Sequence, residues 1–174
     1  MSRRLDVGDA APSFTLPSQT GELVSLKEII GKKYIVLYFY PKDKTPGCTT
    51  EARSFRDKYE VFREIGAEVI GVSSDSVDSH RDFAMGCDLP FDLLSDAEGR
   101  VRTLYSVPST LGVFPGRVTY IIDTGGIVRH VYSSQMNPGK HAEEAVRALR
   151  SIREQIEREK NTVLFHPPQK PKLA

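Results

Sequence analysis

The amino-acid sequence predicts an α/β protein in which a mixed central β-sheet is flanked by helices on both faces. Short runs rich in apolar, β-branched and aromatic residues alternate along the chain with segments whose apolar residues recur at helical spacing. The last two strand-like runs are separated only by the turn residues Thr124-Gly125-Gly126, which predicts a β-hairpin at that point. This order of elements favours an α/β sandwich with a mixed sheet.

The first buried strand is expected at residues 34–40. This run is apolar and aromatic throughout and ends at Pro41, as in a central strand covered on both faces. Before it, residues 1–33 are punctuated by proline and glycine and are expected to be extended with short strands. After it, a helix closed by Gly66 is expected, because five apolar residues share one helical stripe: Ala52, Phe55, Tyr59, Phe62 and Ile65.

The second half of the chain continues the alternation of strands and helices. A buried strand is expected at 68–72, and Ser76 opens a short helix that ends near Gly86. Asn137 can cap the last helix, with Pro138 at its first position and an apolar stripe from Ala142 to Ile156. The remaining expected elements are a strand at 91–94, a helical turn at 98–104 and hairpin strands at 117–123 and 127–132. A β-α-β opening, a hairpin and a closing helix suit a thioredoxin-like fold.

Length and charge limit the classes of protein that the chain can be. Its 174 residues fit one domain, expected at 1–160, and residues 161–174 are expected to form a flexible tail. The 24 basic and 23 acidic residues nearly cancel, so neither a nucleic acid nor an anionic membrane is an expected partner. A signal peptide would have an apolar segment after Arg3-Arg4, and the sequence has none there. The longest apolar run is far shorter than the roughly 20 residues that a membrane span needs. A soluble, cytoplasmic protein is expected.

The chemistry is expected at Cys48, one of only two cysteines. Thr45 can serve as the N-cap of the helix with Pro46 at its first position, which places Cys48 in the first turn. Unpaired backbone N–H groups and the positive end of the helix dipole lie there, and such positions lower the pKa of a thiol from about 8.5 to about 3.5–7.5. The preceding loop is expected to be exposed. The alternative is a buried cysteine held by packing.

A lowered thiol pKa does not by itself give fast chemistry. More thiolate forms, but each thiolate is a weaker nucleophile, so that roughly a few-fold gain remains. Fast attack therefore needs hydrogen-bond donors aimed at the leaving oxygen. The candidates are the Thr45 hydroxyl, the N–H groups near Gly47 and Cys48, and an arginine from elsewhere in the chain.

At this point the chain resembles a known family. Residues 41–48, Pro-Lys-Asp-Lys-Thr-Pro-Gly-Cys, are similar to the Pro-x-x-x-Thr-x-x-Cys signature of the peroxiredoxins, and residues 38–52 resemble the Q-type subgroup, also called bacterioferritin comigratory proteins. Further matches occur in the family's order between about residues 5 and 158: Gly8 to Phe14, Gly71-Val72-Ser73, Leu89-Pro90-Phe91, Leu94-Ser95-Asp96, and Arg117 before Thr119-Tyr120-Ile121-Ile122-Asp123.

The resemblance implies a thiol-dependent peroxidase. Cys48 would attack hydrogen peroxide or an organic hydroperoxide and become a sulfenic acid. Thr45 and Arg117 would be the polar partners of the thiolate and peroxide, and Pro41 would shield the sulfenate. In the absence of this resemblance, Arg117 would be interpreted as a solvated arginine at the start of an edge strand and Pro41 as the residue that ends a strand. Thioredoxin or a similar thiol donor is the expected reductant, no cofactor or metal is expected, and the chain is expected to be a monomer or weak homodimer.

The second cysteine departs from the family pattern. Many Q-type members carry a resolving cysteine at the position of Arg53 here, and others carry one at the position of Ala84. Cys87 lies about one turn later, near a helix end, where it is expected to be exposed and mobile. Either Cys87 resolves the sulfenic acid or it is a bystander and an external thiol reduces Cys48 directly.

Two other functions are compatible with a reactive Cys48. A thiol–disulfide oxidoreductase usually needs Cys-x-x-Cys, whereas Thr45 stands three residues before Cys48. A redox sensor or holdase would use oxidation of Cys48 without peroxidase turnover. The four histidines lack metal-ligand spacing and are expected to be solvated or capping, and Asp75 and Asp78 are expected to be helix-start acids.

Overall fold

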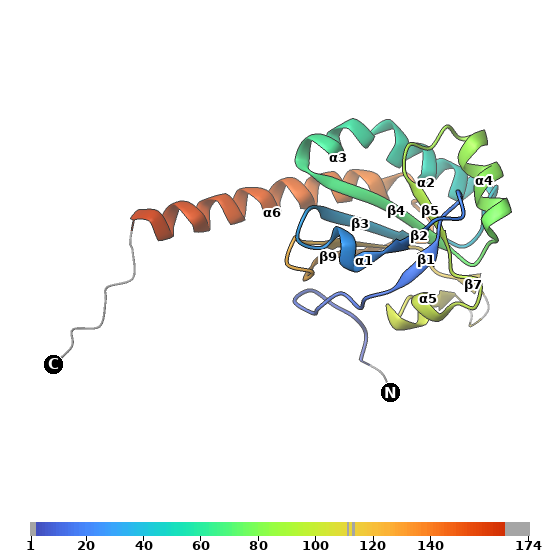
Figure 1. The fold of residues 1–174 in the computed structure, drawn as a ribbon, viewed down its shortest axis with the longest axis horizontal. Helices are drawn as coiled ribbons and strands as arrows, with labels where there is room; N and C mark the ends of the chain where they lie inside the picture. Colours follow the sequence, from blue (N-terminus) through green and yellow to red (C-terminus); the bar gives the residue numbers. More distant parts are fainter. Residues whose placement is uncertain (1–2, 111, 113, 166–174) are drawn as a thin grey trace.

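The fold is a mixed β-sheet between two layers of helices (Figure 1), as the computed structural model shows for residues 3–110, 112 and 114–165. The five strands of the sheet run in the order β5-β4-β3-β8-β9. β3, β4 and β5 are parallel, whereas β8 is antiparallel to β3 and to β9. The predicted fold class is confirmed. The strands are β3 (Tyr34–Phe39), β4 (Ala67–Ser73), β5 (Asp92–Ser95), β8 (Val118–Ile122) and β9 (Val128–Ser133).

Each face of the sheet has its own hydrophobic core. One core contains Tyr38 and Val69 of the sheet, and it is covered by α2 (Pro46–Asp57), α3 (Tyr59–Ile65), α4 (Val77–Gly86) and α6 (Lys140–Phe165). The other contains Leu37 and Val72, covered by α1 (Leu26–Ile29) and α5 (Arg100–Leu104). The central strand β3 is buried on both faces, which explains why its sequence is apolar without alternation.

Short strand pairs lie outside the main sheet. β1 (Thr15–Pro17) pairs antiparallel with β2 (Leu23–Ser25), and β6 (Ser109–Thr110) pairs antiparallel with β7 (Phe114–Pro115). The expected short strands before residue 34 are therefore present. Among the helices of the described residues, none is both long and apolar enough to cross a bilayer.

The helix expected to run from Pro46 to Ile65 is two helices. The chain leaves helical geometry at Lys58, whose φ of −103° and ψ of 5° separate α2 from α3. The bend keeps Phe55 of α2 and Phe62 of α3 in the same core, with ring centroids 6.0 Å apart. Gly66 ends α3 in the left-handed conformation, as predicted.

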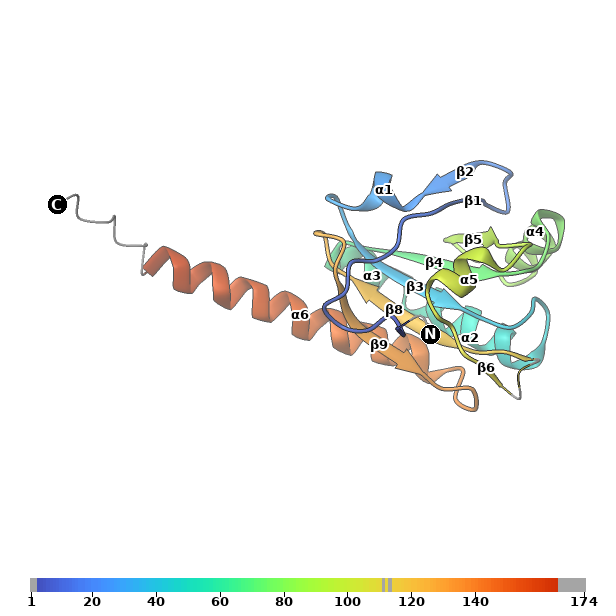
Figure 2. The ribbon, with the colours of Figure 1, turned by 90° about the horizontal axis from the view of Figure 1, so that it is seen from below.

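The last helix starts later and ends later than expected. Asn137 accepts a hydrogen bond from the N–H of Lys140 through its backbone carbonyl, and α6 begins at Lys140 rather than at Pro138. The helix continues to Phe165, beyond the predicted domain boundary at residue 160, and its end projects away from the body in both views (Figures 1 and 2). The rest of the predicted tail, residues 166–174, lies outside the described residues.

Candidate active site

Cys48 lies in the first turn of α2, directly after the loop that follows β3. Thr45 stands at the N-cap position with extended backbone (φ −74°, ψ 151°), and Pro46 begins the helix, both as predicted. The Thr45 side chain makes no capping hydrogen bond. The N–H groups of Gly47 and Cys48 belong to this first turn and have no acceptor within the helix.

Cys48 is buried, with 1% of its surface exposed, and the expectation of an exposed site is wrong. The sulfur-bearing side chain packs in the core beside Tyr38, Tyr40 and Ala52. In the loop of residues 41–45, Lys42 and Lys44 are exposed as predicted, whereas Pro41 and Thr45 are partly buried. Asp43 in its middle is 5% exposed and is hydrogen-bonded inside the protein, so this residue anchors the loop to the body.

The guanidinium of Arg117 faces the sulfur. Its Nη2 lies 3.5 Å from Cys48 Sγ, which it contacts as a donor. Arg117 directly precedes β8, and β8 pairs with β3 in a register that sets Val118 opposite Phe39. The sheet thus carries residue 117 to the end of β3, where the Cys48 loop begins. Arg117 is 5% exposed and precedes an internal strand, so the alternative of a solvated arginine at an edge strand is wrong.

Glu51 holds Arg117 in place, and the sequence did not indicate it. Its Oε2 pairs with Arg117 Nη1, and both side chains are buried. Glu51 stands three residues after Cys48 on α2, and residues three apart share a side of a helix. That spacing, with a carboxylate on the apolar side of the helix, was the signal available.

Burial and the neighbouring charges act in opposite directions on the pKa values of Glu51 and Arg117. Burial raises the pKa of Glu51 from 4.5 to about 8, although the Arg117 guanidinium acts to lower it. Burial acts to lower the pKa of Arg117, but the charges of Glu51 and Cys48 raise it on balance. Arg117 therefore keeps its proton and presents a permanent positive charge to the sulfur.

His141 of α6 extends the buried network behind Glu51. Its Nδ1 is 2.8 Å from the Thr119 hydroxyl and its Nε2 is 2.9 Å from the Ser134 carbonyl oxygen. A carbonyl only accepts, so Nε2 carries the proton and Nδ1 accepts from Thr119 in the neutral ring. Burial lowers the pKa of His141 to about 4.

Two of the four histidines contradict the expectation of solvated or capping roles. His141 and His80 are both fully buried and hydrogen-bonded on two sides. His130 is half-buried, and His166 lies outside the described residues.

Arg102 of α5 is a second arginine near the site that the sequence did not single out. Its Nη2 donates to the carbonyl of Tyr40 at 2.8 Å, and its Nη1 donates to the carbonyl of Gly116 at 3.2 Å. Arg102 therefore links Tyr40, which precedes Pro41, to Gly116, which precedes the site residue at position 117. A side chain at Gly116 has no room, since an added Cβ would lie 2.2 Å from the Pro108 carbonyl oxygen.

Thr45 and Pro41 are near the site, but their predicted roles are not visible as contacts. The Thr45 hydroxyl donates to the carbonyl of Lys42 at 3.0 Å, and within the described residues it has no hydrogen bond to Cys48. Pro41 is partly buried at the end of β3. The roles of Thr45 and Pro41 therefore stay predictions.

Cys87 is the C-cap residue of α4 and is buried, 4% exposed. The expectation of an exposed, mobile thiol is wrong, because the helix end packs into the same core that contains Cys48. Its carbonyl accepts a hydrogen bond from Arg56 of α2 at 2.8 Å. Both cysteines are free thiols in the structure. Arg53, at the family's usual resolving position, is an exposed residue of α2.

Comparisons with known proteins identify the family of this chain. Residues 7–131 match the AhpC/TSA family. The chain is 50% identical over 147 residues to chloroplastic peroxiredoxin Q of Sedum lineare, an alignment that covers 84% of this chain and 78% of that protein. It is 49% identical to chloroplastic peroxiredoxin Q of Arabidopsis thaliana, with 85% and 68% covered.

Solved structures give the same answer. Peroxidoxin BcpB of Mycobacterium tuberculosis superposes with a TM-score of 0.80 at 38% identity, covering 86% of this chain and 99% of that one. A mutant of PrxQ from Xylella fastidiosa superposes with a TM-score of 0.79 at 29% identity, covering 86% and 98%. The chain therefore belongs to the AhpC/TSA family, and within it to the Q-type peroxiredoxins.

Proposed function

We propose that Cys48 is the attacking sulfur through which this peroxiredoxin, a thiol-dependent peroxidase, reduces hydroperoxides. The observation that carries the proposal is the Arg117 guanidinium, fixed by the buried Glu51 and lying 3.5 Å from the Cys48 sulfur. A positive charge at this distance stabilises a thiolate and any negative oxygen that forms beside it.

In the oxidative step the Cys48 thiolate attacks one peroxide oxygen and the O–O bond breaks. The bonding electron pair leaves on the other oxygen, which takes a proton and departs as water or an alcohol, while the sulfur becomes a sulfenic acid. Arg117 and the first-turn N–H groups of Gly47 and Cys48 are placed to stabilise the charge on the departing oxygen. Family resemblance adds Thr45 as a further donor and Pro41 as a shield.

Hydrogen peroxide and organic hydroperoxides are the proposed substrates. A solved relative from Xanthomonas campestris, 31% identical to this chain, is described by its alkyl peroxide reduction activity.

In the reductive step a thiol attacks the sulfenic sulfur, a disulfide forms and water leaves. Two routes supply that thiol. Cys87 would give an internal disulfide, and an external thiol would give a mixed disulfide. Cys48 and Cys87 are free thiols of the same core, and the internal route needs the start of α2 and the end of α4 to bring their Cα atoms within about 7 Å of each other. We propose thioredoxin or a similar dithiol protein as the final reductant.

Paired cysteine variants test the site. Cys48→Ser should lose peroxide consumption with a thioredoxin system, whereas Cys87→Ser should keep the first turnover because the attacking sulfur is intact. Intact mass after one equivalent of peroxide then separates the two routes. If the parent chain loses the mass of two hydrogens and Cys87→Ser does not, an internal disulfide has formed. If the mass increases by one oxygen, the sulfenic acid is stable. Undiminished turnover by Cys48→Ser would refute the assignment.

Two further expectations stay predictions. Sedimentation over a range of concentrations would decide between a monomer and a weak homodimer. The cytoplasmic location is likewise undecided, since several similar proteins carry the word chloroplastic in their names.

A further inference from the structure

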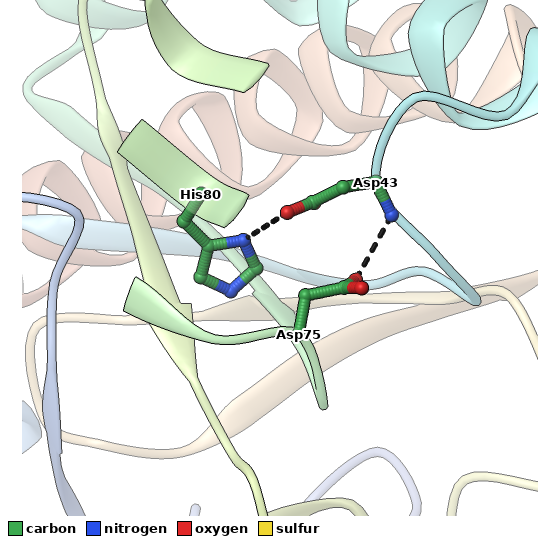
Figure 3. Close-up of side chains that lie close together, drawn as sticks. All are labelled: Asp43, Asp75 and His80. Atoms are coloured by element: carbon green, nitrogen blue, oxygen red, sulfur yellow. Dashed lines mark hydrogen bonds and ion pairs between the residues drawn. The ribbon is translucent and has the colours of Figure 1, made fainter. Parts of the chain in front are cut away.

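The loop that leads into Cys48 is fastened to α4 by a buried cluster of polar side chains around Asp43 (Figure 3). One carboxylate oxygen of Asp43 lies 2.7 Å from His80 Nδ1 and accepts from the Ser79 hydroxyl at 2.8 Å. The other oxygen accepts from the Tyr40 hydroxyl at 2.6 Å. Asp43 belongs to the loop, whereas Ser79 and His80 belong to α4.

The Asp43–His80 contact contains a proton held away from water. The opposite ring nitrogen of His80, Nε2, lies 3.0 Å from the carbonyl oxygen of Leu94, which can only accept, so Nε2 carries a proton. A second proton lies between Nδ1 and the Asp43 oxygen. The side chains of His80 and Asp43 are 0% and 1% exposed, and such charge-assisted hydrogen bonds are strong.

Asp75 holds the loop at a second point. Its Oδ2 accepts the backbone N–H of Asp43 at 2.9 Å and the Ser73 hydroxyl at 2.6 Å, so it is more than the expected helix-start acid. Asp43, Asp75 and His80 offer ligand atoms within 4.8 Å of one another. Each of the three already has protein hydrogen-bond partners, which favours a structural role over metal binding.

The loop conformation depends on being held. Lys44, the residue after Asp43, has a φ of +64°. This left-handed conformation is strained for a residue with a side chain, and it persists only where surrounding contacts impose it. The contacts of Asp43 with α4 and with Asp75 supply that constraint one residue away.

The closed loop has opposite consequences for the two half-reactions. A peroxide is small, and it needs the ordered donors around Cys48. A thiol from Cys87 or from another protein must instead reach a sulfur that is 1% exposed, which requires the site to open. This holds for both routes of reduction.

We propose that Asp43 and His80 are positioning residues whose buried pair acts as a brace, holding the 41–45 loop closed over Cys48 and setting how often the site opens. The role in catalysis rests on the proposed function of Cys48. Loosening the brace speeds reduction of the sulfenic acid by thiols and slows its formation by peroxide.

Asp43→Asn tests the brace, with Asp82→Asn as its matched control. Asp82 also links α4 to the loop, through Lys44 at 3.5 Å, but both side chains are more than half exposed and such pairs contribute little.

In a Cys87→Ser background Cys48 is the sole thiol, because the chain has two cysteines. The measured quantity is the ratio of two alkylation rates of Cys48, that with a bulky maleimide divided by that with iodoacetamide. We expect Asp43→Asn to raise this ratio about tenfold and Asp82→Asn to leave it within about twofold. Because both reagents react with the Cys48 thiolate, a change in the fraction of thiolate alters both rates alike and cancels in their ratio.

Rapid-quench mass spectrometry then follows each half-reaction. Asp43→Asn should slow sulfenic acid formation and speed its reduction by a thiol, whereas a general loss of stability would not move the two steps in opposite directions. Should Asp43→Asn fail to fold, Ser79→Ala removes only the hydroxyl contact and should shift the alkylation ratio about threefold. An unchanged alkylation ratio in these variants would overturn the brace. The alkylation result stands without peroxide chemistry, so it separates failure of the brace from failure of the proposed function.

Discussion

At the scale of single residues, the reactivity of Cys48 depends on neighbours that fix charge rather than on the thiol alone. Arg117 presents its Nη2 to the sulfur, and Glu51 holds the same guanidinium through its other terminal nitrogen, Nη1. Gly47 leaves the space in which Arg117 lies, since a Cβ at this position would be 3.2 Å from Arg117 Nη2. The absence of a side chain at Gly47 is thus part of the geometry of the site.

Gly47→Ala should lower the rate constant for reaction with hydrogen peroxide by about tenfold, because the added methyl group pushes Arg117 away from the sulfur. Thermal stability should not fall, since alanine favours the helix over glycine. Gly86→Ala is the matched control, as an added Cβ at that helical position meets nothing within 4 Å. Stopped-flow peroxide kinetics on both variants measure the effect, and equal rates would contradict it.

At the scale of helices and strands, the site is assembled where three elements meet. β3 leads into the Cys48 loop, the adjacent β8 begins just after Arg117, and α6 packs His141 against Thr119 of β8. The neutral His141 ring fills this junction with both nitrogens hydrogen-bonded. A charged ring would lose the bond from Thr119. The carboxylate near it, Glu51, has its Oε1 3.7 Å from His141 Nδ1 and is already paired through Oε2 with Arg117.

His141 should therefore make the fold sensitive to acid. Its pKa is about 4 in the folded protein and 6.5 when unfolded, so the unfolded chain binds a proton first as pH falls. Its contribution to stability is complete above pH 6.5 and is lost between 6.5 and 4, by roughly 3 kcal/mol at 1.36 kcal/mol per pKa unit. Urea unfolding across this pH range gives the slope.

The comparison variant is His141→Gln, which removes the titrating group. Its absolute stability should be lower, but its stability should change less between pH 6.5 and 4 than that of the parent chain. Parallel pH profiles for the two proteins would contradict this assignment.

At the scale of the whole molecule, the two cores around the sheet account for the body, and the end of α6 stands apart from it (Figure 1). The buried residues of α6 lie in its first three turns, from His141 to Leu149. Residues 157–165 are exposed, including Val163, Leu164 and Phe165. Most helical stability comes from packing against other elements, and this segment has none within the described residues.

Ending the chain after Glu157 should therefore leave the body intact. We expect the free energy of unfolding to change by no more than about 0.5 kcal/mol, as for other changes at exposed positions. Peroxide consumption should also be unchanged. Urea unfolding and activity assays measure both, and a large loss of either would show that the projecting end of α6 supports the body or the site.

Much of the fold followed from local pattern. The central strand, the start of α2 at Pro46, the Ser76 cap of α4 and the glycine end of α3 are each specified by a few neighbouring residues, and the structure contains all four. The break at Lys58 and the length of α6 were missed, because they depend on how helices meet the body and not on helical periodicity.

The sequence by itself determined most of the strands and helices, the family and the place of Cys48 in the first turn of α2, since these depend on neighbouring residues and on motifs in order. Only the tertiary structure decided that Cys48 and Cys87 are buried and that Arg117 pairs with Glu51. It also decided that Asp43 pairs with His80. The partners in these contacts lie 69, 66 and 37 positions apart for Arg117–Cys48, Arg117–Glu51 and Asp43–His80. No local pattern specifies such pairs, because they form only where the sheet and the packing of α4 bring distant segments together.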